Sequence, residues 1–281
     1  MKRMVGVMVG LLVLVIGGRA ATLTSEVRER CVEILRNGLG GADFWPAMHA
    51  AEGLTAAGHG AEVRKVLGPL LVDERDDQRR CGLARELVRA GDVGKCRVLT
   101  AILASHDPHG HVHAAESLFK VGWQGEAVCL KDAWQRAGDL RLQLMAAGAL
   151  AKQGDRAALL FLRRTLQLES DPRLLGQTAW LLGRVGGEPD RVGIRQRLAD
   201  VADTATRAVL EHSLAALGDA EGRKALLRNL TAADPRIRTA AAIFAADARL
   251  EAAVPALIGL LDDANLDTRI RAAHSLLVLV R

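Results

Sequence analysis

MHAAEGL, at residues 48–54, returns in slightly altered form as VHAAESL at residues 112–118. Each copy places a histidine three residues before a glutamate: His49 before Glu52, and His113 before Glu116. On a helix such positions lie on one face, so the pairs are either two halves of a metal site or parts of one structural unit used twice. We favour the second interpretation, because the same unit recurs along the chain.

The repeated pattern is a small residue, an apolar residue three positions later, and a glycine four positions after that. The five clear copies are Ala51–Leu54–Gly58, Ala84–Leu87–Gly91, Ala115–Leu118–Gly122, Ala147–Leu150–Gly154 and Ala179–Leu182–Gly186. Three looser copies follow at Glu211–Leu214–Gly218, Ala241–Phe244–Ala248 and Ala273–Leu276–Val280. Successive copies lie 30 to 33 residues apart, and a fixed period of this length is typical of a repeat architecture.

Each unit reads as two helices. The pattern above forms the second, because alanine and leucine three apart make an apolar stripe and a glycine just beyond suits a left-handed cap. Its start is marked at Asp107-Pro108, Asp171-Pro172 and Asp234-Pro235 by an N-cap acceptor followed by proline. The first helix is the preceding stretch, such as 224–230 or 254–263. No stretch alternates with period two, so we predict no strands.

The composition agrees with close helix packing. Apolar residues make up 49% of the 281 residues, yet aromatic residues only 3%, and tyrosine is absent. Small residues let helix axes approach to about 8–10 Å, and one helix pair cannot bury its apolar face alone. The sequence therefore predicts an all-α, right-handed, armadillo-like solenoid of about eight two-helix repeats over residues 25–281.

Two late segments make this type of repeat recognisable. DPRIRTAAAIFA (234–245) and LDTRIRAAHSLL (266–277), with AVPALIGLLDD between them, resemble the short bacterial HEAT-like repeats of the type also seen in phycobilisome lyases. Asp234 with Arg238, and Asp267 with Arg271, match that family's Asp and Arg positions. The resemblance implies the fold strongly and the function weakly, because the family includes scaffolds, adaptors and a few enzymes.

The first 21 residues form a separate segment. Lys2 and Arg3 precede an uncharged apolar run, and the small residues around Arg19 suit cleavage, which is the pattern of a secretory signal peptide. We expect export to the periplasm or the exterior; an uncleaved membrane anchor is the alternative. Cleavage would lower the formal net charge from +5 to about +2, and the chain has no basic tract, so we expect no nucleic-acid partner.

The cysteines and the C-terminus add two expectations. Cys31, Cys81, Cys96 and Cys129 have no CxxC spacing and are too sparse for a disulfide scaffold, so we expect buried free thiols, with one disulfide as the alternative. The chain stops inside LLVLVR (276–281) without a polar capping helix, and solenoid ends need a polar outer face. That end is expected to meet a partner, another copy of the chain, or a fused domain.

Binding is expected on the inner ridge of second helices. Arg85 takes the slot of Glu52 and Glu116 in the repeat between them, which predicts a charged ladder across three helices. Trp180 takes the same slot. We favour its burial against the next repeat; the alternative is exposure on the ridge, where tryptophan and arginine are common interface anchors. The predicted ridge consists of His49, Glu52, Arg85, Arg89, Glu116, Lys120, Trp180, Arg184 and His212.

No metal or cofactor site is expected. The equivalent atoms of the two His/Glu pairs would lie about 20 Å apart in an open array, so they cannot share an ion unless the array folds back on itself. His106, His109, His111 and His113 are weak candidates for zinc or copper, but they surround a turn and would point several ways. The HEAT-like deoxyhypusine hydroxylases hold iron with His-Glu dipeptides, and this chain has none, since Glu211-His212 is reversed.

These residues favour an exported, non-catalytic scaffold that binds a protein partner on the inner ridge. One alternative is a HEAT-like enzyme or accessory of lyase or iron-dependent oxidoreductase type. Another is a regulatory module of a larger envelope or carbohydrate-processing system. Membrane contact is expected only through the N-terminal segment, and the apolar C-terminal helix could mediate self-association.

Overall fold

The computed structural model describes residues 22–136 and 138–280, and within these ranges it contains helices and no strand. Sixteen α-helices follow one another in pairs, which confirms the prediction of an all-α repeat solenoid. The expected signal peptide, residues 1–21, lies outside the described residues. Among the described helices, none is long and apolar enough to cross a membrane.

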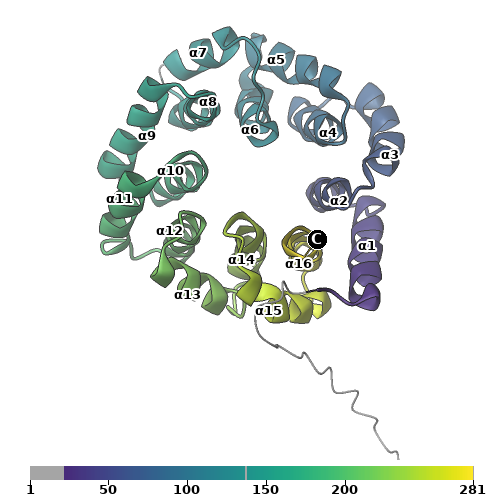
Figure 1. Cartoon of the computed structure of the whole chain (residues 1–281). Coiled ribbons are helices and arrows are strands. Elements are labelled where there is room, and N and C mark those ends of the chain that lie inside the picture. The colour runs from purple at the N-terminus through teal and green to yellow at the C-terminus, as the bar shows by residue number, and fades with distance from the viewer. Residues whose placement is uncertain (1–21, 137, 281) are drawn as a thin grey trace, which may run out of the picture.

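One helix of each pair lies on the outside of the molecule and the other on the inside (Figure 1). The outer helices are α1 (Ser25–Leu39), α3 (Gly60–Asp73), α5 (Cys96–Ala104), α7 (Val128–Gln135), α9 (Arg156–Leu168), α11 (Glu188–Leu198), α13 (Ala220–Asn229) and α15 (Val254–Gly259). The inner helices are α2 (Phe44–Ala56), α4 (Asp77–Arg89), α6 (His111–Val121), α8 (Leu140–Lys152), α10 (Pro172–Val185), α12 (Thr204–Ala216), α14 (Pro235–Asp247) and α16 (Leu266–Leu279). Short 3-10 turns occupy Val93–Lys95, Pro108–Gly110, Glu251–Ala253 and Leu260–Asp262.

The predicted caps are largely present. The carboxylates of Asp171 and Asp234 accept backbone N–H bonds at the starts of α10 and α14, whereas Asp107 caps the 3-10 turn that leads into α6. Gly58, after α2, has the left-handed φ of 93°. Gly186 differs, with φ −88° and ψ −170°, because the chain runs extended from there into α11.

The core follows the repeated pattern. The motif alanines Ala51, Ala84 and Ala115 have no exposed surface, and Leu54 and Leu87 beside them are buried to the same degree. Equivalent helix starts also touch: the Thr206 hydroxyl donates to the Pro172 carbonyl at 3.0 Å. The inner helices therefore run parallel, and their N-termini lie at one end of the space they surround.

The array closes on itself. Helix α16 packs against α2 and α1, so that the first and last repeats lie side by side in a ring (Figure 1). Gly38 of α1 makes this approach possible, because a Cβ there would lie 2.7 Å from the Ile270 side chain. Arg28 also donates to the Val280 carbonyl at 2.7 Å.

Closure corrects the expectation of an unpaired C-terminal end. Leu276, Leu277 and Val280 are buried, and the chain's own first repeat covers the helix that carries them. The four cysteines are free, as expected. Cys31 and Cys81 are fully buried, but Cys96 and Cys129 are only partly so.

Candidate functional site

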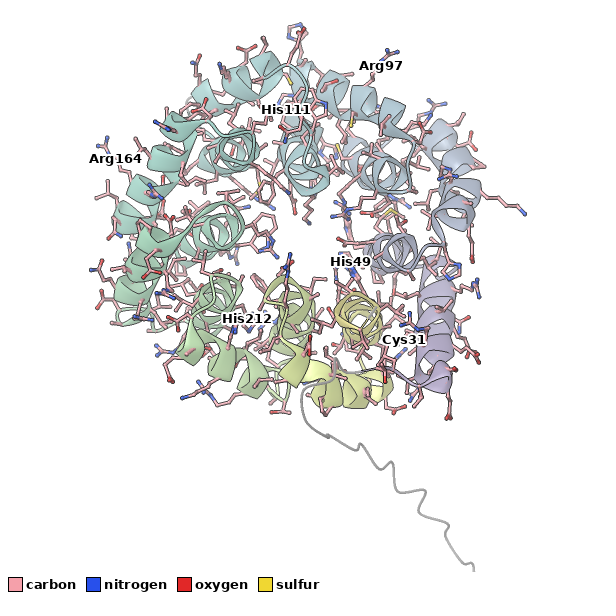
Figure 2. All side chains as sticks on the ribbon, in the orientation of Figure 1. Cys31, His49, Arg97, His111, Arg164 and His212 are labelled. Atoms are coloured by element: carbon pink, nitrogen blue, oxygen red, sulfur yellow. The ribbon has the colours of Figure 1, made fainter. Side chains whose placement is uncertain are left out.

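The inner helices surround the centre of the ring, and side chains extend from them toward it (Figure 2). We call the space that these helices surround the channel. Several of the predicted ridge residues lie on its wall and keep part of their side-chain surface in contact with water. Exposure is 17% for Arg89 and 22% for Glu52, 26% for Lys120 and 20% for Arg184. Ring closure therefore places these groups around one narrow space and not along an open concave face.

An ion-pair network joins the first, second and last repeats. The Glu52 carboxylate lies 2.8 Å from Nη2 of Arg89 and accepts a bond from Nη1 of Arg271 at 2.9 Å. Arg89 also donates to Glu86 at 2.9 Å. Burial acts to raise the pKa of Glu52, but the charges of Arg89 and Arg271 outweigh it and hold that pKa well below its usual range.

The predicted ladder of Glu52, Arg85 and Glu116 is wrong. Arg85 is 4% exposed, and its Nε donates to Glu86, the next residue, at 2.6 Å. Glu86 itself has no exposed surface, so Arg85 acts as the internal partner of a buried carboxylate. It is not available on the channel wall.

Glu116 and Lys120 form a pair of their own at 2.7 Å. Burial tends to raise the pKa of Glu116, but the charge and hydrogen bond of Lys120 hold it at about 2. Burial also lowers the pKa of Lys120, against the opposing pull of Glu116. The pair is thus a lysine–carboxylate contact within one helix, and Glu116 stays ionised near neutral pH.

Trp180 lies in the channel among cations, and its predicted burial against the next repeat is only partial. The guanidinium carbon of Arg184 is 4.6 Å from the centre of the Trp180 ring, and the Lys120 ammonium is 5.7 Å from it. Trp180 also meets Phe119 edge to face at 5.1 Å, while Arg184 pairs with Asp247. These contacts fix the indole in place.

The two histidines of the predicted ridge, His49 and His212, differ in their surroundings. His49 lies 2.6 Å from the Asp267 carboxylate, Nδ1 to Oδ1, and so adds to the contact between first and last repeats. His212 has no exposed surface; its Nε2 lies 3.1 Å from the Asn229 amide and its ring packs on Phe244. The prediction that His212 lies on the binding ridge is therefore wrong.

Three of the four histidines of 106–113 have separate partners, and His106 is exposed. His109 pairs with Asp76 at 2.8 Å, His111 accepts from Arg136 at 2.6 Å, and His113 stacks on Trp45 at 5.3 Å. Among the described residues, no group of three or more His, Cys, Asp or Glu side chains could hold a metal ion.

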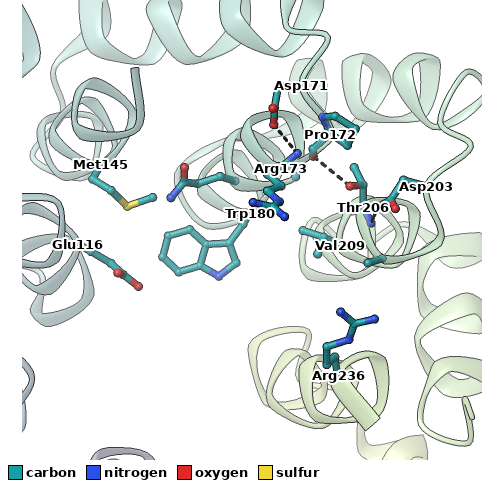
Figure 3. Close-up of a pocket in the computed structure, with 13 residues that line it drawn as sticks. Glu116, Met145, Asp171, Pro172, Arg173, Trp180, Asp203, Thr206, Val209 and Arg236 are labelled. Carbon is teal, nitrogen blue, oxygen red and sulfur yellow. Dashed lines mark hydrogen bonds between the residues drawn. The ribbon is translucent and has the colours of Figure 1, made fainter. Parts of the chain in front are cut away.

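A pocket of about 620 Å³ opens at the end of the channel where the inner helices begin. We call it the N-terminal mouth. Figure 3 shows Trp180 on its inner side, with Arg173 of α10 and Arg236 of α14 around it. Its lining includes the side chains of Glu116, Met145, Arg173, Gln177, Trp180 and Arg236.

Arg173 and Arg236 were absent from the predicted ridge. A signal for them exists in the sequence, because each directly follows an Asp-Pro pair, at 171–172 and 234–235. Those pairs mark helix starts, and the following residue is therefore brought to the same end of the ring. To place Arg173 and Arg236 at one opening, ring closure would also have had to be predicted, because only a ring gathers these positions around one opening.

Comparisons with known proteins assign the chain to no family. No family model matches it, and no curated protein matches it either. Among solved structures, human deoxyhypusine hydroxylase in complex with glycerol is similar over 90% of this chain and 98% of its own, at 18% identity and a TM-score of 0.41. Two engineered proteins are similar at 17% and 18% identity, covering 91% and 89% of this chain and 97% and 82% of their own, with TM-scores of 0.26 and 0.32.

Proposed function

We propose that this chain is an exported binding protein, a scaffold of HEAT-like type, that holds a segment of a protein partner in the N-terminal mouth of its ring. The observation that carries the proposal is the mouth pocket with Trp180 at its inner side. Its volume of about 620 Å³ falls in the range of about 300–1,000 Å³ that is usual for ligand sites. Such a site admits a loop, a terminus or an extended segment, and is too small for a folded domain.

The channel wall beyond the mouth supports this placement. Glu52 is already paired with Arg89 and Arg271 of the chain itself. A partner that docked along the whole ridge would have to break these pairs, at a cost of several kcal/mol for partly buried charges. Docking at the mouth leaves them intact.

Trp180 gives the mouth an anchor. Its indole is positioned by Phe119 and Arg184, so little conformational entropy is lost when a partner packs against it. Tryptophan and arginine are enriched among residues that dominate binding free energy. The mouth combines both types on a rigid helical frame.

The pocket carboxylates favour binding over catalysis. The pKa of Glu116 is held at about 2, and hydrogen bonds from Thr206 lower the pKa of Asp203. Groups that stay ionised and hold internal partners are poor general acids at neutral pH. The mechanism that we propose is therefore recognition by shape and charge on a preformed surface, with no covalent step.

Site-specific crosslinking in the native cell envelope tests the proposal. A photo-crosslinking amino acid at Gln177, within the mouth, should join the chain to one partner protein, and mass spectrometry should map the bond to one segment of it. The matched control carries the same group at Lys65, on the exposed face of α3. A single partner captured equally from both positions, or from neither, would contradict docking at the mouth.

A further inference from the structure

Arginines recur at one position of the repeat around the mouth. The second residue of α8, α10 and α14 is Arg141, Arg173 and Arg236 respectively. All three residues are exposed. Arg173 and Arg236 line the pocket, and Arg141 does not. The same repeat register thus supplies two guanidinium groups to the opening and one nearby.

These guanidinium groups are not used up within the chain. Among the described residues, neither Arg141 nor Arg173 has an ion pair within 4.0 Å, and neither side chain donates a hydrogen bond. Arg236 donates from Nε and Nη2 to the Asp234 carboxylate of its own turn, at 3.1 and 2.7 Å. Its side chain is 83% exposed, and its Nη1 donates to no other group among the described residues. An arginine carries five N–H donors in a flat fork, so most donors at the mouth face solvent.

The pocket carboxylates, by contrast, already have partners. Asp171 accepts from the backbone N–H of Arg173 and Leu174, and Asp203 accepts from that of Thr206. Glu116 is paired with Lys120 at 2.7 Å. Of the charged side chains that line the pocket, Arg173 is therefore the one with no hydrogen-bonding or ion-pair partner among the described residues.

We infer that the partner segment held at the mouth is acidic, and that Arg173 and Arg236 bind its carboxylates. This inference rests on the proposed function for the identity of the ligand as a peptide. Guanidinium forks bind carboxylates in two parallel hydrogen bonds. Trp180 and Met145 offer an apolar surface between the two arginines for the rest of the segment.

Peptide binding by fluorescence anisotropy tests this inference on the full chain. A labelled hexaglutamate peptide should bind saturably at fixed ionic strength, and at least tenfold more tightly than hexaglutamine with the same label. The double variant Arg173→Gln, Arg236→Gln should weaken hexaglutamate binding at least tenfold, about 1.4 kcal/mol. Arg141→Gln is the control at the same repeat position but outside the pocket. It removes one positive charge where the double variant removes two, and it should alter binding less than twofold.

Three results would overturn the inference. They are equal binding of the two peptides, an effect of Arg141→Gln as large as that of the double variant, and displacement of hexaglutamate by millimolar inorganic phosphate as complete as that by excess unlabelled peptide. Circular dichroism should show unchanged helix content in all variants, since the three arginines are exposed. If crosslinking at Gln177 captures a partner while hexaglutamate fails to bind, the scaffold proposal stands and only the acidic character of the segment is wrong.

Discussion

The Glu52 carboxylate in the first repeat accepts a hydrogen bond from Arg271 in the last repeat at 2.9 Å, although 219 positions separate them in the chain. Its other oxygen lies 2.8 Å from Arg89 of the second repeat. One carboxylate thus ties together both sides of the junction where the ring closes. Its loss would leave two guanidinium groups facing each other in a confined space.

We therefore expect Glu52→Ala to lower the free energy of unfolding by about 3 kcal/mol, the scale on which removing one partner of a buried ion pair acts. Glu221→Ala is the control, because the Glu221–Lys224 pair is 76% and 67% exposed and should contribute less than about 1 kcal/mol. Urea denaturation followed by circular dichroism measures both. Equal midpoints for the two variants would show that Glu52 does not secure the junction.

Ring closure can also be tested by a substitution that disturbs the packing between α1 and α16. A Cβ at Gly38 would meet Ile270 at 2.7 Å and Ala50 at 3.0 Å, whereas one at Gly68 of α3 would meet nothing within 4 Å. Both glycines lie inside helices, so Gly38→Val and Gly68→Val change helix propensity alike. We expect the first to destabilise the chain by about 1–3 kcal/mol through overpacking and the second to be neutral or slightly stabilising. Small-angle X-ray scattering should show a larger radius of gyration for Gly38→Val alone if the junction opens.

The repeats were predictable because their signals are local. Alanine and leucine at helical spacing, with Asp-Pro before three of the inner helices and glycine after six of them, indicate the helix pairs without reference to one another. Ring closure has no such signal. It depends on a small rotation at every interface and on contacts such as Gly38 with Ile270, which are specified by residues at opposite ends of the chain.

The candidate site shows the same limit. Repeat register placed Glu52, Glu116 and Trp180 on the inner wall correctly, but it could not assign partners. Arg85 pairs with its neighbour Glu86, and the cation for Glu52 comes from Arg271 across the junction. Which of these side chains pair depends on which ones meet when the ring closes.

Two buried histidines should make the ring sensitive to mild acid. Burial lowers the pKa of His274 from 6.5 to about 4 and that of His212 from 6.5 to about 3. Between about pH 6.5 and these values the unfolded chain binds protons that the folded chain does not, so stability falls as the pH falls. The slope reaches at most about 1.4 kcal/mol per pH unit for each histidine.

His274→Gln should therefore flatten the dependence of stability on pH between 6.5 and 5, measured by urea denaturation at half-unit steps. Glu116 does not interfere in this window. Its lowered pKa of about 2 contributes stability that is lost only as the pH falls below about 4.5, its ordinary value. An unchanged slope in His274→Gln would mean that this side chain is protonated in the folded ring.

The four free cysteines should divide into two pairs by reactivity. Burial raises the pKa of Cys31 to about 11 and that of Cys81 to about 12, and neither residue has exposed surface. Cys96 and Cys129 are partly exposed, and burial raises their pKa values as well, so they should react slowly but completely. Because the thiolate is the reacting form, iodoacetamide at pH 8 should add two groups to the native chain and four in urea, as counted by intact mass. Peptide mapping should assign the native modifications to Cys96 and Cys129.

Alkylation of Cys31 in the native state at a comparable rate would mean that the junction between α1 and α16 opens in solution, because Cys31 lies in α1 on the side of the ring where the first and last repeats meet.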